Sequence, residues 1–146
     1  MDLALAEAKK AAAVGEVPVG AVIVDPKGTV IASAANRTRR DSDPTAHAEI
    51  LAIRKAAKFL GNDRLVGCTM YVTLEPCAMC AGALSHARVA RIIYGAPDPK
   101  SGGTDHGARV FEHAQTHHRP EVLGGISEAA CSTLIRNFFN TRRAKS

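Results

Sequence analysis

The pattern of apolar and polar positions divides the chain into helices and strands. Residues 3–13 are rich in alanine and other good helix formers, which predicts a helix. Two apolar, β-branched segments at 17–24 and 29–34 flank residues 25–28, whose Pro-Lys-Gly sequence suits a type I turn, so a β-hairpin is predicted there. Residues 106–120 show no clear pattern. Further strands are predicted at 69–74, 89–95 and 121–123, and further helices at 76–86 and 127–143.

One further helix has the clearest start signals, and it is predicted to begin at Pro44. Asp43 can cap this helix, and proline suits the first helical position because no backbone N–H is needed there. The sequence from 61 to 63, Gly-Asn-Asp, ends the helix. Its core-facing residues follow an i, i+4, i+7 pattern and are predicted to be Ala46, Ile50, Ile53, Ala57 and Leu60.

The order of these elements predicts the fold. From residue 44 onward the order is helix, strand, helix, strand, which is typical of parallel strands joined by right-handed crossovers. Because an antiparallel hairpin precedes them, the sequence predicts an α/β fold: a three-layer α/β/α sandwich with a mixed sheet of about five strands, formed by residues 1–146 as a single domain. Ligands on such sheets bind where strands end and helices begin, so chemistry is expected around residues 44–49 and 75–80.

Those two segments contain His47, Glu49, Cys77 and Cys80. The two cysteines are three residues apart and share one face in the first turn of a helix, where the helix N-terminus favours thiolates. One imidazole and two thiolates make three zinc ligands and leave a fourth position for water. Two thiolates weaken the metal as a Lewis acid, so a neighbouring base is needed, and Glu49 is the candidate. Positions i and i+2 do not face each other on a regular helix, so His47 and Glu49 converge only near a helix start.

Other interpretations of the cysteines stay open at this point. A Cys-x-x-Cys pair can be redox-active, although a thioredoxin-like site does not require His47 and Glu49 at the preceding helix start. A structural zinc site would need a fourth protein ligand, such as Cys68, Cys131 or another histidine. Core packing is the better interpretation of Cys68 and Cys131. Surface or loop positions are expected for His86, His106, His113, His117 and His118.

Taken in order, these residues resemble the signature of the zinc-dependent cytidine/deoxycytidylate deaminase superfamily and, within it, the bacterial tRNA adenosine deaminases. The resemblance extends over residues 16–143. The matching segments are 16–22 (EVPVGAV), 36–37 (NR), 43–50 (DPTAHAEI), 71–81 (YVTLEPCAMCA), 95–100 (GAPDPK) and 138–143 (FFNTRR). The segment 105–120 departs most from the family pattern.

The resemblance implies a cytidine deaminase-like fold and one Zn²⁺ per subunit, held by His47, Cys77 and Cys80, with Glu49 as the proton shuttle. It implies that Asn36 hydrogen-bonds the base and that Asp98 lies near the ribose of a flipped nucleotide. The implied reaction is hydrolytic deamination of adenosine to inosine at the wobble position of a tRNA anticodon loop, by a homodimer with no other protein partner. The alternatives are a free-base or nucleotide deaminase acting on guanine or cytosine, and a non-catalytic zinc-stabilised RNA-binding subunit.

The charge is concentrated at the C-terminus. The chain has a net charge of +5, yet residues 136–146 contain four basic and no acidic side chains, including Lys145. Arginine beside an aromatic ring is a common way to hold single-stranded RNA, but a basic helix end also complements the helix dipole, and Phe138 continues the apolar stripe of the last helix. With the resemblance, Phe139, Arg142 and Arg143 are predicted to contact RNA, and Phe138 is predicted to belong mainly to the core.

The sequence also predicts the compartment. Its longest segment without a charged residue is 76–87, 12 residues, against about 20 apolar residues for a membrane span. The first ten residues contain charges too early for a signal peptide, and four cysteines are too few for a disulfide scaffold. A cytoplasmic location without membrane contact is therefore expected.

Overall fold

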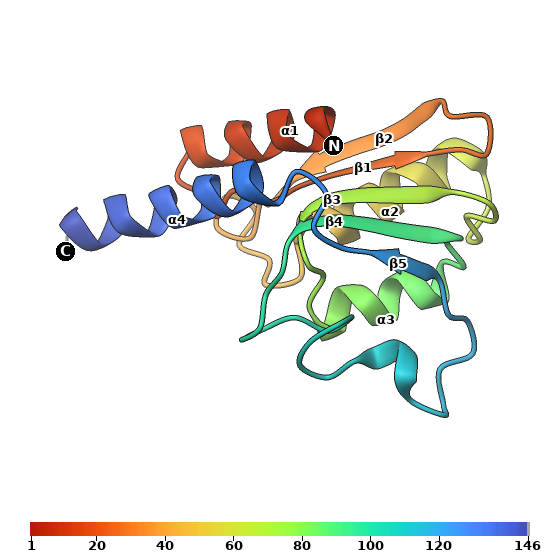
Figure 1. Ribbon diagram of the computed structural model, residues 1–146. Helices are drawn as coiled ribbons and strands as arrows, with labels where there is room; N and C mark the ends of the chain where they lie inside the picture. Colours follow the sequence, from red (N-terminus) through yellow and green to blue (C-terminus); the bar gives the residue numbers. More distant parts are fainter. Residues whose placement is uncertain (146) are drawn as a thin grey trace.

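The structure is a computed structural model that describes residues 1–145, with side chains described as far as residue 143, so the side chain of Lys145 lies outside the described part. The chain forms an α/β domain (Figure 1). Its helices are α1 (Asp2–Ala13), α2 (Ala48–Leu60), α3 (Ala78–His86) and α4 (Glu128–Lys145), with a 3-10 turn η1 (Val110–Glu112). Its strands are β1 (Gly20–Val24), β2 (Val30–Ala35), β3 (Thr69–Leu74), β4 (Arg91–Ala96) and β5 (Glu121–Leu123).

The five strands form one mixed sheet in the order β2-β1-β3-β4-β5. β1 pairs antiparallel with both β2 and β3, and β3, β4 and β5 run parallel to one another. The register places Ala21 opposite Val72 and Met70 opposite Ile92. This arrangement confirms the predicted hairpin followed by parallel strands.

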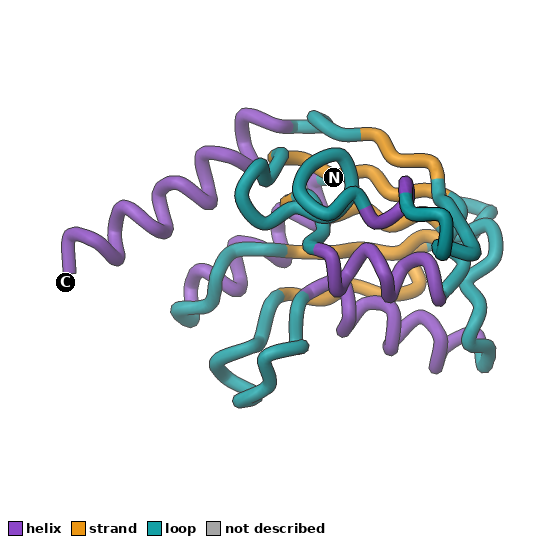
Figure 2. Tube along the Cα trace, turned by 90° about the horizontal axis from the view of Figure 1, so that it is seen from below, coloured by secondary structure: helices purple, strands orange, loops and turns teal. Residues whose placement is uncertain are grey.

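Helices cover both faces of the sheet, which confirms the three-layer sandwich. Figure 1 shows α1 and α4 on one face, and Figure 2 shows α2 and α3 on the other. The core between the layers contains buried side chains such as Met70, Val72 and Ile92. Cys68 and Cys131 are both 1% exposed and belong to this interior, as predicted. At Cys131 the contact is close, because a Cβ at Gly95 would lie 2.3 Å from its Sγ.

The predicted start of α2 is wrong by four residues. Asp43 Oδ1 accepts hydrogen bonds from the backbone N–H of Thr45 at 2.9 Å and from its hydroxyl at 2.7 Å. This local turn occupies the carboxylate that was expected to cap the helix, and such side-chain turns compete with helix formation. The N-cap is instead His47, in extended backbone at φ −70° and ψ 151°. In the same way α3 begins at Ala78 rather than at Pro76, with Cys77 as its N-cap.

The predicted core-facing stripe of α2 is only partly correct. Ala46 is fully buried, and Ile53 and Ala57 pack against the core, but the prediction is wrong at Leu60. The buried row consists of Ala48, Ala52 and Ala56, each fully buried, while Leu60 is 42% exposed. Alanine has no side chain beyond Cβ, so a row of alanines at i, i+4 and i+8 lets the helix lie close to β1 and β2. Ile53 packs at the edge of the core, where it is only partly buried.

Among the described residues, no helix combines the length and the apolar character that a membrane span requires.

Candidate metal centre and pocket

Two helix starts meet beyond the carboxyl end of β3. His47 and Cys77 are the N-caps of α2 and α3, and both have extended backbone, at ψ 151° and 175°. Their side chains therefore project from the residue just before each helix. Cys80 follows one turn into α3, on the face shared with Cys77. The structure thus brings together three side chains that are 30 and 33 residues apart in the chain.

The ligand atoms of His47, Cys77 and Cys80 converge closely enough to hold one metal ion. His47 Nδ1 lies 3.7 Å from Cys77 Sγ and 3.5 Å from Cys80 Sγ, and the three atoms all lie within 4.8 Å of one another. A tetrahedral zinc ion with Zn–N and Zn–S bonds of about 2.0 and 2.3 Å places its ligand atoms about 3.5 Å apart. The geometry and the donor set therefore fit zinc.

The site provides three protein ligands, and this distinguishes a catalytic zinc site from a structural one. Cys68 and Cys131, the candidates for a fourth ligand, are packed in the core. Among the described residues, the only cluster of histidine, cysteine or acidic side chains with metal-ligand spacing is His47, Cys77 and Cys80. A tetrahedral ion in this site has one coordination position left for water or substrate.

The two thiols are electrostatically unequal in the metal-free chain. A hydrogen bond from Cys80 and another from His47 lower the pKa of Cys77 to about 4. Cys80 donates the shared proton, so its own pKa is raised. The hydrogen bond to Cys77 also raises the pKa of His47. The site therefore contains a thiolate before any metal binds, which is the form of cysteine that binds zinc.

Glu49 lies beside the metal ligands without belonging to them. Its side chain is 4% exposed, and this burial raises the pKa of its carboxyl to about 7, with a further contribution from the nearby Cys77 thiolate. Because His47 precedes the helix as its N-cap, the i, i+2 spacing does not keep His47 and Glu49 apart. A carboxyl group with a pKa near neutrality is suited to both accepting and donating a proton at physiological pH.

A pocket of about 260 Å³ opens over this centre. Asn36 and Asp98 both line it, together with His47, Glu49 and Cys77. The structure thus brings the two predicted substrate-binding residues to the same pocket as the predicted proton shuttle. The remaining lining residues are Val17, Val19, Thr38, Ala48, Leu74, Glu75 and Ser101.

The side chains of Asn36 and Asp98 are held by local hydrogen bonds. Asn36 Oδ1 accepts the backbone N–H of Thr38 at 3.3 Å, and Asn36 Nδ2 donates to the Val17 carbonyl at 3.4 Å. Asp98 Oδ1 accepts the backbone N–H of Ser101 at 3.0 Å. Asp98 is therefore oriented by its own loop, whereas Asn36 is oriented both by its own loop and by the segment before β1.

The structure does not bring the predicted RNA-binding residues to this pocket. Phe139 and Arg143 lie exposed on the outer half of α4, which projects beyond the sheet (Figure 1). Arg142 is engaged within the protein: its guanidinium lies 4.7 Å from the centre of the Phe138 ring and donates to the Gly15 carbonyl. Phe138 is half-buried and meets Phe139 edge-to-face, with ring centres 5.4 Å apart.

Sequence reasoning missed two residues near the pocket, Glu75 and His106. Glu75 is 2% exposed, and its carboxylate accepts hydrogen bonds from the loop that contains Asp98. Its position at the end of β3, directly before Pro76 and Cys77, was a signal for this placement. His106 was expected in a surface or loop position, and it lies in a loop, yet its Nδ1 is 2.7 Å from Glu75 Oε1. Nothing in the pattern indicated that pairing.

Comparison with known proteins identifies the family. Residues 1–96 match the model of the cytidine and deoxycytidylate deaminase zinc-binding region. The chain belongs to this deaminase family. The matched segment contains the three metal ligands His47, Cys77 and Cys80, and it also contains Glu49.

Full-length relatives of this deaminase are also known. It is 50% identical over 143 residues to the tRNA-specific adenosine deaminase of Agrobacterium fabrum, a match that covers 98% of this chain and 93% of that protein. A structure from work on A-to-I editing by tRNA:A34 deaminases at the wobble position of transfer RNA matches with a TM-score of 0.90 at 51% identity, covering 92% and 96% of the two chains. A structure of the guanine deaminase of Nitrosomonas europaea matches at 22% identity with a TM-score of 0.80, covering 94% and 81%, and shows a common fold.

Proposed function

We propose that this deaminase converts adenosine to inosine at the wobble position of tRNA anticodons. The observation that carries the proposal is the His47, Cys77 and Cys80 triad with Glu49 buried beside it, in a chain 50% identical along nearly its whole length to a tRNA-specific adenosine deaminase. The net reaction consumes one water molecule and releases ammonia.

The metal that fits the site is Zn²⁺, held by His47, Cys77 and Cys80. When bound, zinc supplies Lewis-acid activation of water at neutral pH. Glu49 supplies the proton transfers. Its carboxylate accepts a proton from the attacking water and delivers it to the ring nitrogen. It then accepts the proton of the new C6 hydroxyl group and delivers it to the departing amino group, so that ammonia can leave. Burial of Glu49, which raises the pKa of its carboxyl in the metal-free chain to about 7, suits a group that exchanges protons at neutral pH.

The pocket residues orient the substrate in this proposal. Asn36 hydrogen-bonds the base, and Asp98 contacts the ribose, as the resemblance implies. A base must leave its stack to enter such an enclosed pocket, which costs least in a single-stranded loop. This cost favours an anticodon loop over a base-paired region as the substrate.

The outer half of α4 contributes RNA contacts outside the pocket. Phe139 is 41% exposed, which leaves its ring accessible for stacking on a base. Arg143 is exposed on the same helix end and adds a positive charge for phosphate. Arg142 contributes indirectly. Its contacts with Phe138 and the Gly15 carbonyl hold in place the helix on which Phe139 and Arg143 lie.

We further propose that the enzyme is a homodimer and acts in the cytoplasm, where it would meet tRNA. Support for the dimer comes from exposed apolar side chains beside the metal helices: Phe59 at the end of α2 is 69% exposed and Met79 at the start of α3 is 39% exposed. Exposed apolar side chains on these helices are available for contact with a second subunit. Sedimentation velocity should show a particle of twice the chain mass, and a monomer at micromolar concentration would contradict the dimer.

The function is tested by comparing substrates. The zinc-loaded protein is incubated with an anticodon stem-loop that has adenosine at the wobble position, and separately with free adenosine, guanine and cytosine. We expect inosine in the stem-loop and turnover of the free compounds at least about 100-fold slower. A stem-loop with guanosine at the wobble position is the matched control. Turnover of free guanine or cytosine without turnover of the stem-loop would contradict the proposal and support a free-base deaminase.

A further inference from the structure

The loop that contains Asp98 is attached to the end of β3 by a single buried carboxylate. Glu75 Oε1 accepts the backbone N–H of Asp98 at 3.0 Å and lies 2.7 Å from His106 Nδ1. Glu75 Oε2 accepts the backbone N–H and the hydroxyl of Thr104, at 3.3 and 3.2 Å, and the backbone N–H of His106 at 2.9 Å. Three loop residues thus direct five donors at one side chain. We refer to residues 97–106 as the Asp98 loop.

These donors occupy both oxygens of Glu75. A carboxylate offers about four acceptor positions, and here five donors share them. Although Glu75 borders the pocket, it therefore has no oxygen left to bind a substrate or to move a proton. Burial raises the pKa of the Glu75 carboxyl, but the hydrogen bonds from Asp98 and His106 lower it by more. The group is thus held as an anion.

The Asp98 loop also lies directly against the helix that holds the metal ligands. The backbone N–H of Gly103 donates to the Pro76 carbonyl at 2.7 Å, and a Cβ at Gly103 would lie 2.6 Å from the Cys77 carbonyl carbon. A Cβ at Gly102 would lie 2.5 Å from Glu75 Oε2. Only glycine allows this close approach at the two positions. The loop and the start of α3 therefore form one packed unit.

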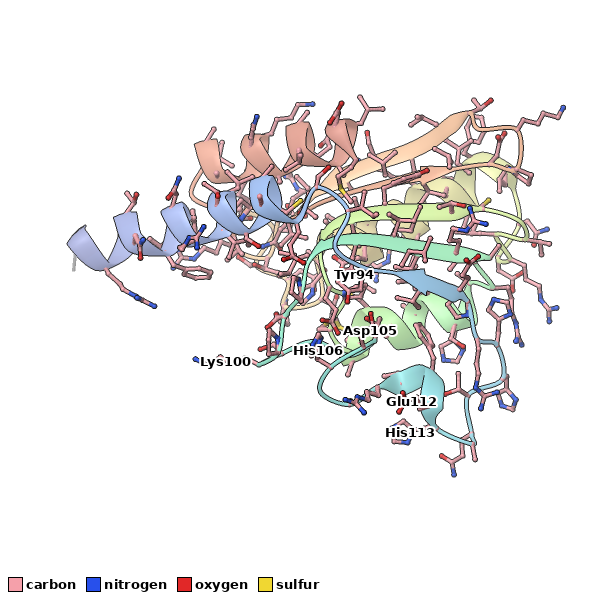
Figure 3. The ribbon with its side chains drawn as sticks, viewed as in Figure 1. Tyr94, Lys100, Asp105, His106, Glu112 and His113 are labelled. Atoms are coloured by element: carbon pink, nitrogen blue, oxygen red, sulfur yellow. The ribbon has the colours of Figure 1, made fainter. Side chains whose placement is uncertain are left out.

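A second attachment holds the far end of the loop. The hydroxyl of Tyr94, on β4, donates to Asp105 Oδ2 at 2.6 Å. Figure 3 shows Tyr94 and Asp105 close together, with His106 nearby and Lys100 at the outer edge of the loop. Glu75 and Tyr94 thus fix the loop from adjacent parallel strands, β3 and β4.

We propose that Glu75 is a positioning residue for the deamination reaction: with His106 as its side-chain partner, it holds the Asp98 loop against the start of α3. Asp98 and Ser101 are thereby fixed as part of the wall of the pocket that Asn36 also lines. The carboxylate acts on the substrate through the loop and not by contact. In its absence the metal centre keeps its three ligands, but the pocket loses a fixed wall.

The test uses Glu75→Gln with Glu121→Gln as the matched control. Glutamine presents an amide group to loop donors that need an acceptor, so some of the hydrogen bonds are lost. Glu121 is an exposed carboxylate on β5 that pairs with Arg91, at 3.0 Å. For Glu75→Gln we expect faster amide hydrogen exchange in peptides that cover 97–106, unchanged zinc content, and a KM for the stem-loop that rises by about tenfold while kcat falls by less than about threefold. Glu121→Gln should behave as wild type in all three measurements.

His106→Phe provides an independent, milder variant, with His113→Phe as its control in the same exposed region. It removes one of the five donors and should move exchange and KM in the same direction as Glu75→Gln, by about threefold. In the double variant the two effects should be less than additive, because both act on one contact. If Glu75→Gln fails to fold, the His106→Phe result decides alone.

The kinetic part of the test rests on the proposed function, whereas the exchange measurement does not. Exchange in 97–106 that is unchanged in both variants would overturn the proposal even if the stem-loop is deaminated. Faster exchange with an unchanged KM would also overturn it, because the loop would then be loosened without consequence for the substrate. If the wild-type protein does not deaminate the stem-loop but the variants show faster exchange, the tRNA substrate is contradicted. The attachment of the Asp98 loop by Glu75 would then still be supported.

Discussion

The metal pocket and the outer half of α4 hold their functional side chains in different ways. In the pocket, Glu49 is 4% exposed. The buried carboxylate of Glu16 accepts the backbone N–H groups of Arg39 and Arg40 in the loop that follows Asn36, and the buried carboxylate of Glu75 holds the Asp98 loop. On α4, Phe139 is 41% exposed and is held mainly by its own helix and by Phe138. Geometry in the pocket is therefore set by the fold. The outer half of α4, by contrast, presents Phe139 and Arg143 to solvent.

The largest effect is expected in the pocket, from Glu49→Ala. General acid–base catalysis by one side chain contributes about 10²–10⁴-fold, so kcat on the stem-loop should fall by about three orders of magnitude. Zinc content, measured by mass spectrometry of the metal, should remain one ion per chain because Glu49 is not a ligand. Retained activity would show that Glu49 does not take part in the reaction, and loss of zinc would show that it contributes to metal binding.

The next effect concerns stability, and its sign follows from the raised pKa of Glu49. The folded-state pKa is about 7 against an ordinary value of 4.5, so the folded metal-free chain keeps a proton that the unfolded chain releases. Stability from this group is thus highest below about pH 4.5 and declines as the pH rises to 7. Glu49→Gln removes the decline, so at pH 8 the metal-free variant should be more stable than the wild type by about 3 kcal/mol.

Urea unfolding of the metal-free proteins between pH 4.5 and 8 measures this difference. It should shrink to zero at the acidic end of the range. A difference that is constant across the range would show that burial of Glu49 does not determine its ionisation.

Smaller effects are expected on α4 and should appear in RNA binding alone. Phe139→Ala removes an exposed ring, and loss of one stacked base corresponds to about a tenfold weaker stem-loop affinity. Arg143→Gln should weaken binding about threefold and reduce the slope of log K against log salt by about 1. Turnover of saturating substrate should stay within about twofold of wild type. A large loss of kcat in either variant would contradict the separation of the two regions.

The smallest effect is expected from Arg142→Gln, and it should appear in stability. This variant loses the cation–π contact with Phe138 and the hydrogen bond to the Gly15 carbonyl. We expect a decrease in Tm of about 3 °C. Arg136→Gln on the same helix is the control and should leave Tm unchanged, because its guanidinium bonds the exposed hydroxyl of Thr133, one turn away on α4. Equal Tm values for the two variants would show that Arg142 does not hold α4.

The metal centre could be predicted from the sequence because its members lie in two short segments at predicted helix starts. His47, Glu49, Cys77 and Cys80 have residue types whose chemistry is specific, and the strand–helix order places both starts at the same end of the sheet. The sheet itself was predictable for a similar reason, since a hairpin followed by helix–strand repeats allows few topologies.

Other features could not be predicted because residue type does not reveal them. Glu75 is bonded by backbone N–H groups of the Asp98 loop, which every residue except proline carries, and by a histidine 31 positions away. The contact of Arg142 is with a backbone carbonyl 127 positions away. The buried alanine row of α2 was missed because alanine contributes little to a hydrophobic pattern. Ile50 and Leu60 contribute strongly to the pattern, yet Ile50 is only partly buried and Leu60 is exposed.

The most direct test of the account is inosine sequencing of bacterial tRNA after treatment with the zinc-loaded protein, with Glu49→Ala as the control. Inosine changes the base read from adenosine to guanosine at the modified position. The account predicts this change at position 34 of a tRNA with adenosine there, and at no other adenosine, with the wild-type protein and not with the variant. Absence of the change at the wobble position, or an equal change with Glu49→Ala, would contradict it.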